Sequence, residues 1–256
     1  MKRIVMAMVV LSTLVSQAFA QTSPSEIDAP EGDWSYSVGI SNTNARWMPY
    51  DVVVGISRFQ FQGTYHGLSD AVEVRGRIGA ANLVFNEVDL GGSVRDLSSD
   101  GYGLFGGLGI QSELWRSENE KWSIAASLDG NVYSAMENTV RSGTNQFKEV
   151  RFDPTLEIDA ALVAGRKIGE GTVYAGPKVN FSYARADLRT YTFGSSPSVV
   201  DEIDALTIRN KGGVSAIAGW ETPVGKNGER KRWHIRFEGE MGDGVLGSGL
   251  YLIRSR

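Results

Sequence analysis

Serine, histidine and carboxylate side chains are the residues of this sequence that could carry out hydrolysis. A serine hydrolase needs an imidazole that takes the proton from the serine, and a carboxylate that orients the imidazole. The chain has two histidines and no cysteine. His66 falls in a predicted turn near Ser69 and Asp70, and His234 falls on the polar side of a predicted strand. We therefore predict no catalytic residues and, without cysteines or closely spaced histidines, no metal site.

A glycine pattern of the G-x-G-x-x-G type occurs at 101–106 (GYGLFG). In dinucleotide-binding proteins this pattern follows a strand and opens a helix, whose N-terminus faces the pyrophosphate. Here a predicted loop precedes the glycines, and 107–110 continue as a strand. We therefore interpret them as small residues where strands pack closely, and we predict no cofactor.

Acidic residues occur in same-side pairs, Glu157 with Asp159 and Glu238 with Glu240, which could act as acid and base. Arginine and lysine side chains share the same side of the strands, and buried charges must be paired. A neutralised polar interior is therefore the simpler interpretation. The predicted interior charge network consists of Glu73, Arg75, Arg77, Glu157, Asp159, Lys178, Arg209, Lys211, Arg232, His234, Arg236, Glu238 and Glu240.

A period of two in hydrophobicity predicts the strands that must position these charges. The clearest case is 231–241 (KRWHIRFEGEM), where apolar and charged residues alternate. Ten strands are predicted, near 34–41, 50–60, 70–80, 101–114, 121–135, 155–167, 171–186, 207–221, 231–241 and 245–254. Pro177 falls inside one of them, where it should remove a ladder hydrogen bond.

The predicted connections alternate in length, as they do in outer-membrane barrels. The long ones are 41–49, 81–100, 136–154 and 187–206; the short ones are 115–120, 168–170 and 222–230, and 61–69 is intermediate. The last connection, near 242–244, is short where a long loop is expected. We predict an all-β, antiparallel up-and-down transmembrane β-barrel of about ten strands, with eight or twelve as alternatives and both termini in the periplasm.

Charge on one face of several strands indicates that the polar face is the interior and that the apolar face meets lipid. Aromatic residues support this, because indole and phenol rings prefer the membrane interface. Trp115 does not follow the alternation that places the other tryptophans on the apolar face, and it falls in a predicted turn. The predicted interface aromatics are Trp34, Trp122, Trp220 and Trp233 at the periplasmic rim and Tyr50, Tyr102 and Tyr183 at the opposite rim.

The first residues predict export. Lys2 and Arg3 precede an apolar run, and Ala18-Phe19-Ala20 forms an A-x-A cleavage site. We predict a signal peptide at 1–20, a short periplasmic segment at 21–33 and the barrel at 34–256. The net charge of −4 argues against nucleic-acid binding, and the absence of cysteine excludes disulfide bonds.

This layout resembles the small bacterial outer-membrane barrels of the OmpA-like and opacity-protein kind. Gly247, Leu250 and Leu252 fit the glycine and hydrophobic positions of the terminal signal that the barrel-assembly machinery recognises, whereas Val245 replaces a usual polar residue and Arg256 ends the chain instead of an aromatic residue. The resemblance implies the cell outer membrane as the location, outer-membrane lipid and the assembly machinery as partners, and surface partners at the long loops.

We expect a non-enzymatic function: a structural role, display of surface loops, or a narrow pore for small solutes. One alternative is a barrel enzyme, a lipid hydrolase or protease. Both histidines are predicted near the periplasmic end, however, whereas an enzyme for surface lipid needs its site near the outer leaflet. The other alternative is a soluble periplasmic barrel that binds an apolar ligand, which would need an apolar interior.

Overall fold

The computed structural model describes residues 32–48, 52–69, 71–89, 94–98, 102–141, 146–193, 197–210, 213–224, 233–242 and 244–255. Every regular element in these ranges is a β-strand. No helix among them is long and apolar enough to cross a membrane.

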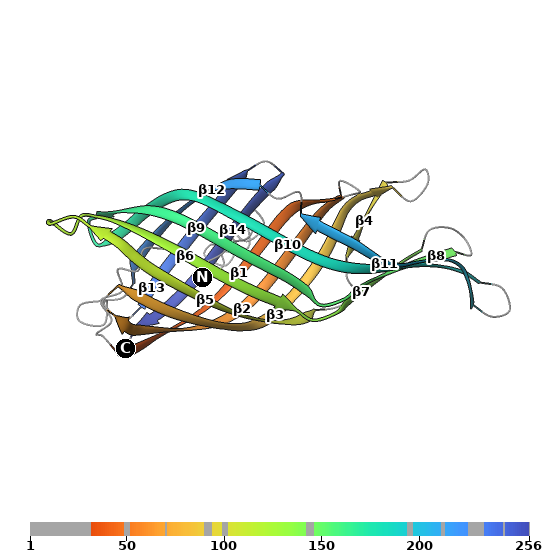
Figure 1. The fold of residues 1–256 in the computed structure, drawn as a ribbon, viewed down its shortest axis with the longest axis horizontal. Coiled ribbons are helices and arrows are strands. Elements are labelled where there is room, and N and C mark those ends of the chain that lie inside the picture. The colour runs from red at the N-terminus through yellow and green to blue at the C-terminus, as the bar shows by residue number, and fades with distance from the viewer. Residues whose placement is uncertain are drawn as a thin grey trace, which may run out of the picture.

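Ten antiparallel strands form a closed barrel (Figure 1). They follow one another around the wall in chain order, and pairing of β12 with β10 closes the ring. Their bounds are β1 Asp33–Met48, β2 Val52–Ser69, β3 Val72–Asp89, β5 Gly103–Arg116, β6 Trp122–Tyr133, β9 Thr155–Ile168, β10 Gly171–Phe193, β12 Gly213–Pro223, β13 Trp233–Gly242 and β14 Val245–Ser255.

The predicted fold class and strand number are therefore confirmed, but several predicted boundaries are wrong. β1 continues to Met48, so most of 41–49 is strand. β2 continues to Ser69, so 61–69 is strand as well, and His66 does not lie in a turn. The barrel strand that we expected to begin at 207 begins at Gly213.

Four further strands leave the barrel at one end: β4 Val94–Ser98, β7 Met136–Arg141, β8 Gln146–Phe152 and β11 Pro197–Asn210. β7 pairs with β8, and β8 and β11 both pair with the last part of β10, which gives a sheet in the order β7-β8-β10-β11. We call β7, β8, β11 and residues 183–193 of β10 the extension (Figure 1). The predicted loops 81–100, 136–154 and 187–206 are therefore largely strand.

Charged side chains cross-link the extension. Arg151 on β8 lies 3.6 Å from Glu137 on β7, and its register partner on β10 is Asp187. A hydrogen bond to Glu149 of β8 raises the pKa of Tyr191 on β10. Opposite charges on neighbouring strands stabilise pairing, so these contacts favour a sheet that keeps its register outside the barrel.

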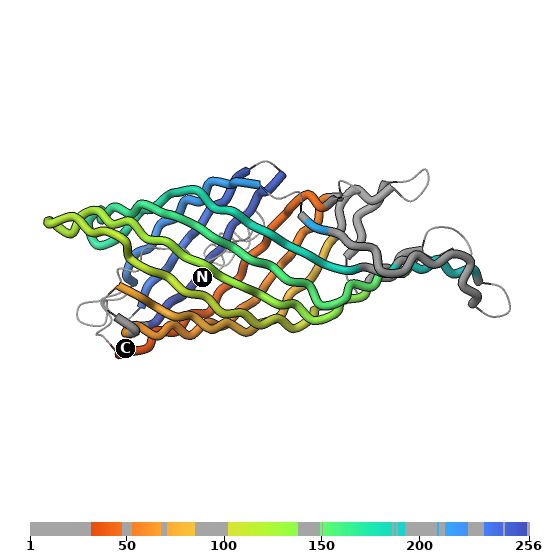
Figure 2. The backbone as a smooth tube through the Cα atoms, in the orientation of Figure 1, coloured from red at the N-terminus to blue at the C-terminus, as the bar shows by residue number. Residues whose placement is uncertain are grey.

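The two ends of the barrel differ. At the terminal end, where β1 begins at Asp33 and β14 ends at Ser255, strands are joined by 70–71, 117–121, 169–170 and 224–232. The extension leaves from the opposite end, which we call the extension end. Two connections there are short, 49–51 and 243–244. Figure 2 shows the strands tilted against the long axis, as closure of a barrel requires.

Pro177 interrupts the ladder in the predicted way. Ala175 pairs with Ala164 and Lys178 with Ala161, but Gly176 and Pro177 have no partner on β9. The pairing register between β10 and β9 is the same before and after these two residues, so the strand contains no bulge there. β10 remains paired with β12 through this stretch, which holds the strand in place.

The outward face is apolar along the middle of the barrel. Large side chains that point outward with more than a third of their surface exposed include Val38, Ile40, Phe59, Phe61, Ile78, Leu108, Ile110, Leu128, Leu162 and Phe181. Most of their inward neighbours are polar and buried, although Ala125, Val163, Tyr174 and Ile217 form a small apolar cluster inside the barrel. A face of this kind suits lipid, whereas a soluble barrel places its apolar face inside.

Towards the extension end this alternation inverts. On β1, Asn42, Asn44 and Arg46 point outward, whereas Ala45 and Trp47 point inward and are buried. Because the outward side chains become polar, this part of the barrel suits water outside it. The strands therefore continue beyond the apolar belt as a barrel of the soluble kind.

Candidate functional site: the barrel lumen

Most of the predicted interior charges lie in the lumen. Glu73 and His234 are half-buried there. Eight of the predicted charges are buried, and each lies on the inward face of its strand: Arg75, Arg77, Glu157, Asp159, Lys178, Arg236, Glu238 and Glu240. They form several connected groups.

Asp129 of β6 is paired with two arginines of β3. Arg75 Nη2 donates to Asp129 Oδ2 at 3.1 Å, and Arg77 donates to the other carboxylate oxygen. Arg75 also donates to Gln111 Oε1 at 3.2 Å. Gly109 of β5 makes room for this group, because a Cβ at that position would lie 1.8 Å from Asp129 Oδ1.

Glu157 of β9 is held across the lumen from β2. Arg58 Nη2 donates to both carboxylate oxygens, at 2.7 and 3.0 Å. Tyr133 and Asn180 donate to the same carboxylate. Since β2 and β9 are not neighbours in the sheet, this group ties opposite walls of the barrel together.

Lys178 of β10 bridges two carboxylates. Its Nζ lies 3.2 Å from Asp159 Oδ1 and 2.9 Å from Glu240 Oε2. Ser215 also donates to Glu240. Lys178 thus offsets the charge of one carboxylate from each of the proposed acid and base pairs.

Glu221 of β12 pairs with basic side chains of β13. Arg236 Nε donates to Glu221 Oε2 at 2.7 Å, and His234 Nδ1 lies 3.4 Å from Glu221 Oε1. On the same face of β13, Glu238 accepts a hydrogen bond from Tyr174.

Some predicted interior residues are placed elsewhere. Arg209 is exposed on β11, because β11 belongs to the extension and not to the barrel wall. Lys211 and Arg232 lie outside the described residues. The predicted network also omitted Arg58, Asp129 and Glu221, although each has the polar parity of its strand. That parity was the available signal for them.

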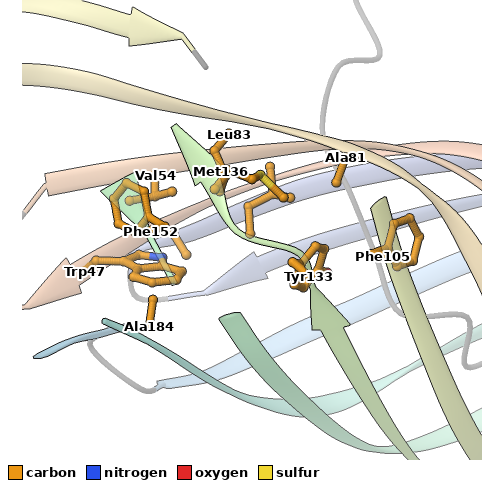
Figure 3. Close-up of a cluster of buried hydrophobic side chains, with 11 residues drawn as sticks. Trp47, Val54, Ala81, Leu83, Phe105, Tyr133, Met136, Phe152 and Ala184 are labelled. Atoms are coloured by element: carbon orange, nitrogen blue, oxygen red, sulfur yellow. The ribbon is translucent and has the colours of Figure 1, made fainter. Parts of the chain in front are cut away.

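An apolar cluster fills the lumen at the extension end (Figure 3). Met136 of β7 and Phe152 of β8 pack against inward side chains of several barrel strands, and all of them are buried. The extension thus inserts two side chains into the mouth of the barrel. The cluster, which we call the apolar plug, consists of Ala45, Trp47, Val54, Ile56, Ala81, Leu83, Phe105, Tyr133, Met136, Phe152 and Ala184.

A different group lies at the terminal end. Ser35 Oγ is 2.8 Å from His66 Nε2, and His66 Nδ1 is 2.9 Å from Glu73 Oε1. The three residues come from β1, β2 and β3, which are neighbours in the wall. Sequence reasoning missed this group because it placed His66 in a turn and did not connect Ser35 with it.

The interface aromatics lie on the outward face. Trp34, Trp122, Trp220 and Trp233 are all exposed at the terminal end. Trp122 and Trp233 each carry an arginine over the ring, Arg166 at 5.0 Å and Arg254 at 5.4 Å.

Two of the other predicted aromatics lie towards the extension end. Tyr102 and Tyr183 are exposed there, and Tyr50 lies outside the described residues. Trp115 was predicted in a turn, but it lies in β5 and is exposed. A register shift between Glu113 and Trp115 turns the side chain of Trp115 to the outward face of the barrel.

In the described part of the chain, no group of three or more histidine, cysteine, aspartate or glutamate side chains could hold a metal ion. Gly103 and Gly106 of the glycine pattern lie within β5, which no helix follows, so the geometry of a dinucleotide site is missing.

Solved structures show what this fold is similar to. The translocator domain of the autotransporter NalP from Neisseria meningitidis matches with a TM-score of 0.51 at 9% identity, over 90% of each chain. The β domain of the Bordetella autotransporter BrkA matches with a TM-score of 0.45 at 12% identity, over 90% of this chain and 100% of that one. The Pseudomonas putida toluene transporter TodX matches with a TM-score of 0.42 at 12% identity, over 94% of this chain and 74% of that one.

At these identities the likeness shows the fold alone, which is that of an outer-membrane β-barrel protein. The sequence matches no family model. It matches no curated protein either. The resemblance to outer-membrane barrels is therefore confirmed, while the OmpA-like or opacity family remains a prediction.

Proposed function

We propose that this chain is an outer-membrane protein with a structural and display role, whose filled barrel anchors the extension on the outside of the cell. The terminal end would face the periplasm, the side from which exported chains insert. Outer-membrane lipid would surround the apolar belt, and a surface partner would bind the extension. Cleavage of residues 1–20 and insertion by the barrel-assembly machinery remain part of the proposal.

One observation carries this proposal: the lumen is filled while a sheet projects from one end. Charged groups bridge the walls in the middle, and the apolar plug occupies the extension end. Small barrels have interiors that side chains can fill. The extension is therefore the part of the described chain that is best placed to meet other molecules.

A narrow pore for small solutes is the second candidate. The hydroxyl groups of Ser41, Ser123 and Ser127 are buried without a protein partner. Buried polar groups are normally satisfied by protein or by ordered water. Water inside the lumen would satisfy them, and a connected file of water would allow conduction.

Planar-bilayer recording separates the two candidates. The folded protein should give no steady conductance, since both the charge network and the apolar plug block the path. A stable open channel in the wild-type protein would refute the filled-barrel proposal and support the pore.

A shortened variant tests whether the barrel assembles without β7 and β8 of the extension. Met136 and Phe152 are register partners, so an Asn-Gly turn can join them in place of residues 137–151. This variant keeps both plug side chains. It should still run faster on a denaturing gel before boiling than after it, as the wild type should. Failure to assemble would show that β7 and β8 are needed to build the barrel and are not only displayed by it.

A further inference from the structure

Ser35, His66 and Glu73 are ordered as in a serine hydrolase. The serine hydroxyl contacts Nε2 of the imidazole at 2.8 Å, and the carboxylate contacts Nδ1 at 2.9 Å. We propose that these residues form an esterolytic site in the lumen at the terminal end, which adds an activity to the proposed display role and replaces the expectation that the chain has no catalytic residues. Ser35 would be the nucleophile, His66 the general base and Glu73 a positioning residue.

The order of contacts around the imidazole is the reason for this proposal. A carboxylate at Nδ1 holds the proton there and leaves the lone pair of Nε2 facing the serine hydroxyl. A serine hydroxyl is a weak nucleophile until a base takes its proton. Each residue lies on a different strand, so the barrel wall fixes all three positions.

Burial strengthens the case. Ser35 is 3% exposed and His66 is 7% exposed. Water therefore competes little for the hydrogen bond between them, and charge that develops on the imidazole is poorly screened. Ser35 is nevertheless only two residues from Asp33, the first residue of β1, so the group lies at the mouth of the barrel and not in its middle.

The place of the Ser35 group in the lumen determines which class of substrate could reach it. The three side chains face the lumen, and the outward face of the same strands carries Trp34 and Tyr36, so membrane lipid does not reach the serine. The inward neighbours Ser37, Thr64 and Arg75 are polar or charged and buried. A small, polar carboxylic ester that enters from the terminal end fits these surroundings.

The reaction would proceed in two balanced steps. Ser35 Oγ attacks the ester carbonyl while His66 Nε2 takes its proton; the C–O bond to the alcohol then breaks, and His66 gives the proton to the departing alkoxide. Water next attacks the acyl-serine, and His66 takes its proton. The carboxylic acid leaves, and the proton returns to Ser35 Oγ.

Covalent labelling tests the nucleophile. The folded full chain in detergent is treated with a small alkyl fluorophosphonate, and the adduct is located by mass spectrometry. We expect the adduct on Ser35, none in Ser35→Ala, and unchanged labelling in Ser41→Ala, an inward, buried serine farther along β1. No adduct on the folded barrel, or an adduct on Ser37 instead, would overturn the proposal.

Hydrolysis of p-nitrophenyl acetate tests the other two roles. His66→Asn should lower kcat about 10³-fold or more, and Glu73→Gln should lower kcat by about 10²–10⁴-fold while KM changes little. The gel shift on boiling confirms that each variant is folded, and His66→Gln replaces His66→Asn if the latter is not. Labelling of Ser35 that is equally fast without the imidazole would show that the contacts are structural only.

Discussion

Each charged side chain that is buried in the lumen depends on partners from other strands. Asp129 accepts hydrogen bonds from Arg75 and Arg77, and Glu157 accepts them from Arg58. A charge that loses its partner in such a place keeps its desolvation cost without compensation. Substitutions at these positions should therefore act far more strongly than their small changes in volume suggest.

Glycine 109 tests how tightly the Asp129 group is packed. Gly109→Ala should lower the free energy of unfolding by about 1–3 kcal/mol, because the new methyl group collides with the carboxylate. Gly130→Ala is the matched control, since a Cβ at that position meets nothing within 4 Å. Urea unfolding of the two variants in detergent gives the comparison. Equal midpoints would mean that the carboxylate moves aside freely.

Arg236 tests the pairing with Glu221. Arg236→Ala should cost about 3–5 kcal/mol of unfolding free energy, because it leaves a buried carboxylate with only His234 beside it. The double variant Glu221→Leu/Arg236→Met removes both charges and should recover much of the loss. An unchanged unfolding midpoint in the single variant would indicate a hydrated lumen and would favour the pore.

Leu128 tests the lipid-facing side. It points outward on β6 between the register partners Ile110 and Ala160. Leu128→Arg should cost about 2–4 kcal/mol and impair assembly, because a cation there lies in the apolar belt. Leu128→Phe keeps the surface apolar and should assemble normally in the same pulse-chase gel assay. Normal assembly of the arginine variant would contradict the assigned outward face.

Prediction of single residues from the sequence succeeded where parity was followed and failed where a strand was cut short. Arg75, Arg77 and Lys178 lie in the lumen as their strands' alternation indicated. His66 was misplaced because its strand was ended too early. The partner of each charge could not be predicted, because contacts across the lumen depend on the tilt and register of strands far apart in the sequence.

At the scale of elements, the inverted alternation explains the wrong boundaries. Residues 41–49 look like a loop because asparagine and arginine occupy the positions that should face lipid. The structure shows that this stretch of β1 lies beyond the apolar belt, where an outward polar side chain meets water. Loops 136–154 and 187–206 were misjudged for a different reason, because no continuous apolar face marks these stretches as strands in the sequence.

The apolar plug gives a prediction at this scale. Phe152→Ala should lower the free energy of unfolding by about 3–5 kcal/mol, because it opens a cavity where β8 meets the barrel. Phe181→Ala is the control, because Phe181 is exposed on the outward face and its loss leaves no buried cavity. Unfolding in detergent compares the two. A larger loss at Phe181 would show that the plug contributes little to the barrel.

At the scale of the whole molecule, three layers follow one another along the lumen. The Ser35 group and the Glu221 group lie at the terminal end, the charges around Arg58, Asp129 and Lys178 lie in the middle, and the apolar plug lies at the extension end. The apolar belt surrounds only the middle part. This arrangement suits a membrane protein that is closed to flow and presents a different surface on each side of the membrane.

The central claim is that the extension faces outward while the terminal end faces the periplasm. The chain has no cysteine, so single cysteines report position without background. Arg151→Cys places a thiol on β8 of the extension, and Glu118→Cys places one in the 117–121 turn. Both positions are exposed, which makes them a matched pair for labelling. In intact cells, a membrane-impermeant maleimide should label Arg151→Cys and should reach Glu118→Cys only after the outer membrane is opened. Labelling of Glu118→Cys in intact cells, with Arg151→Cys protected, would contradict the orientation.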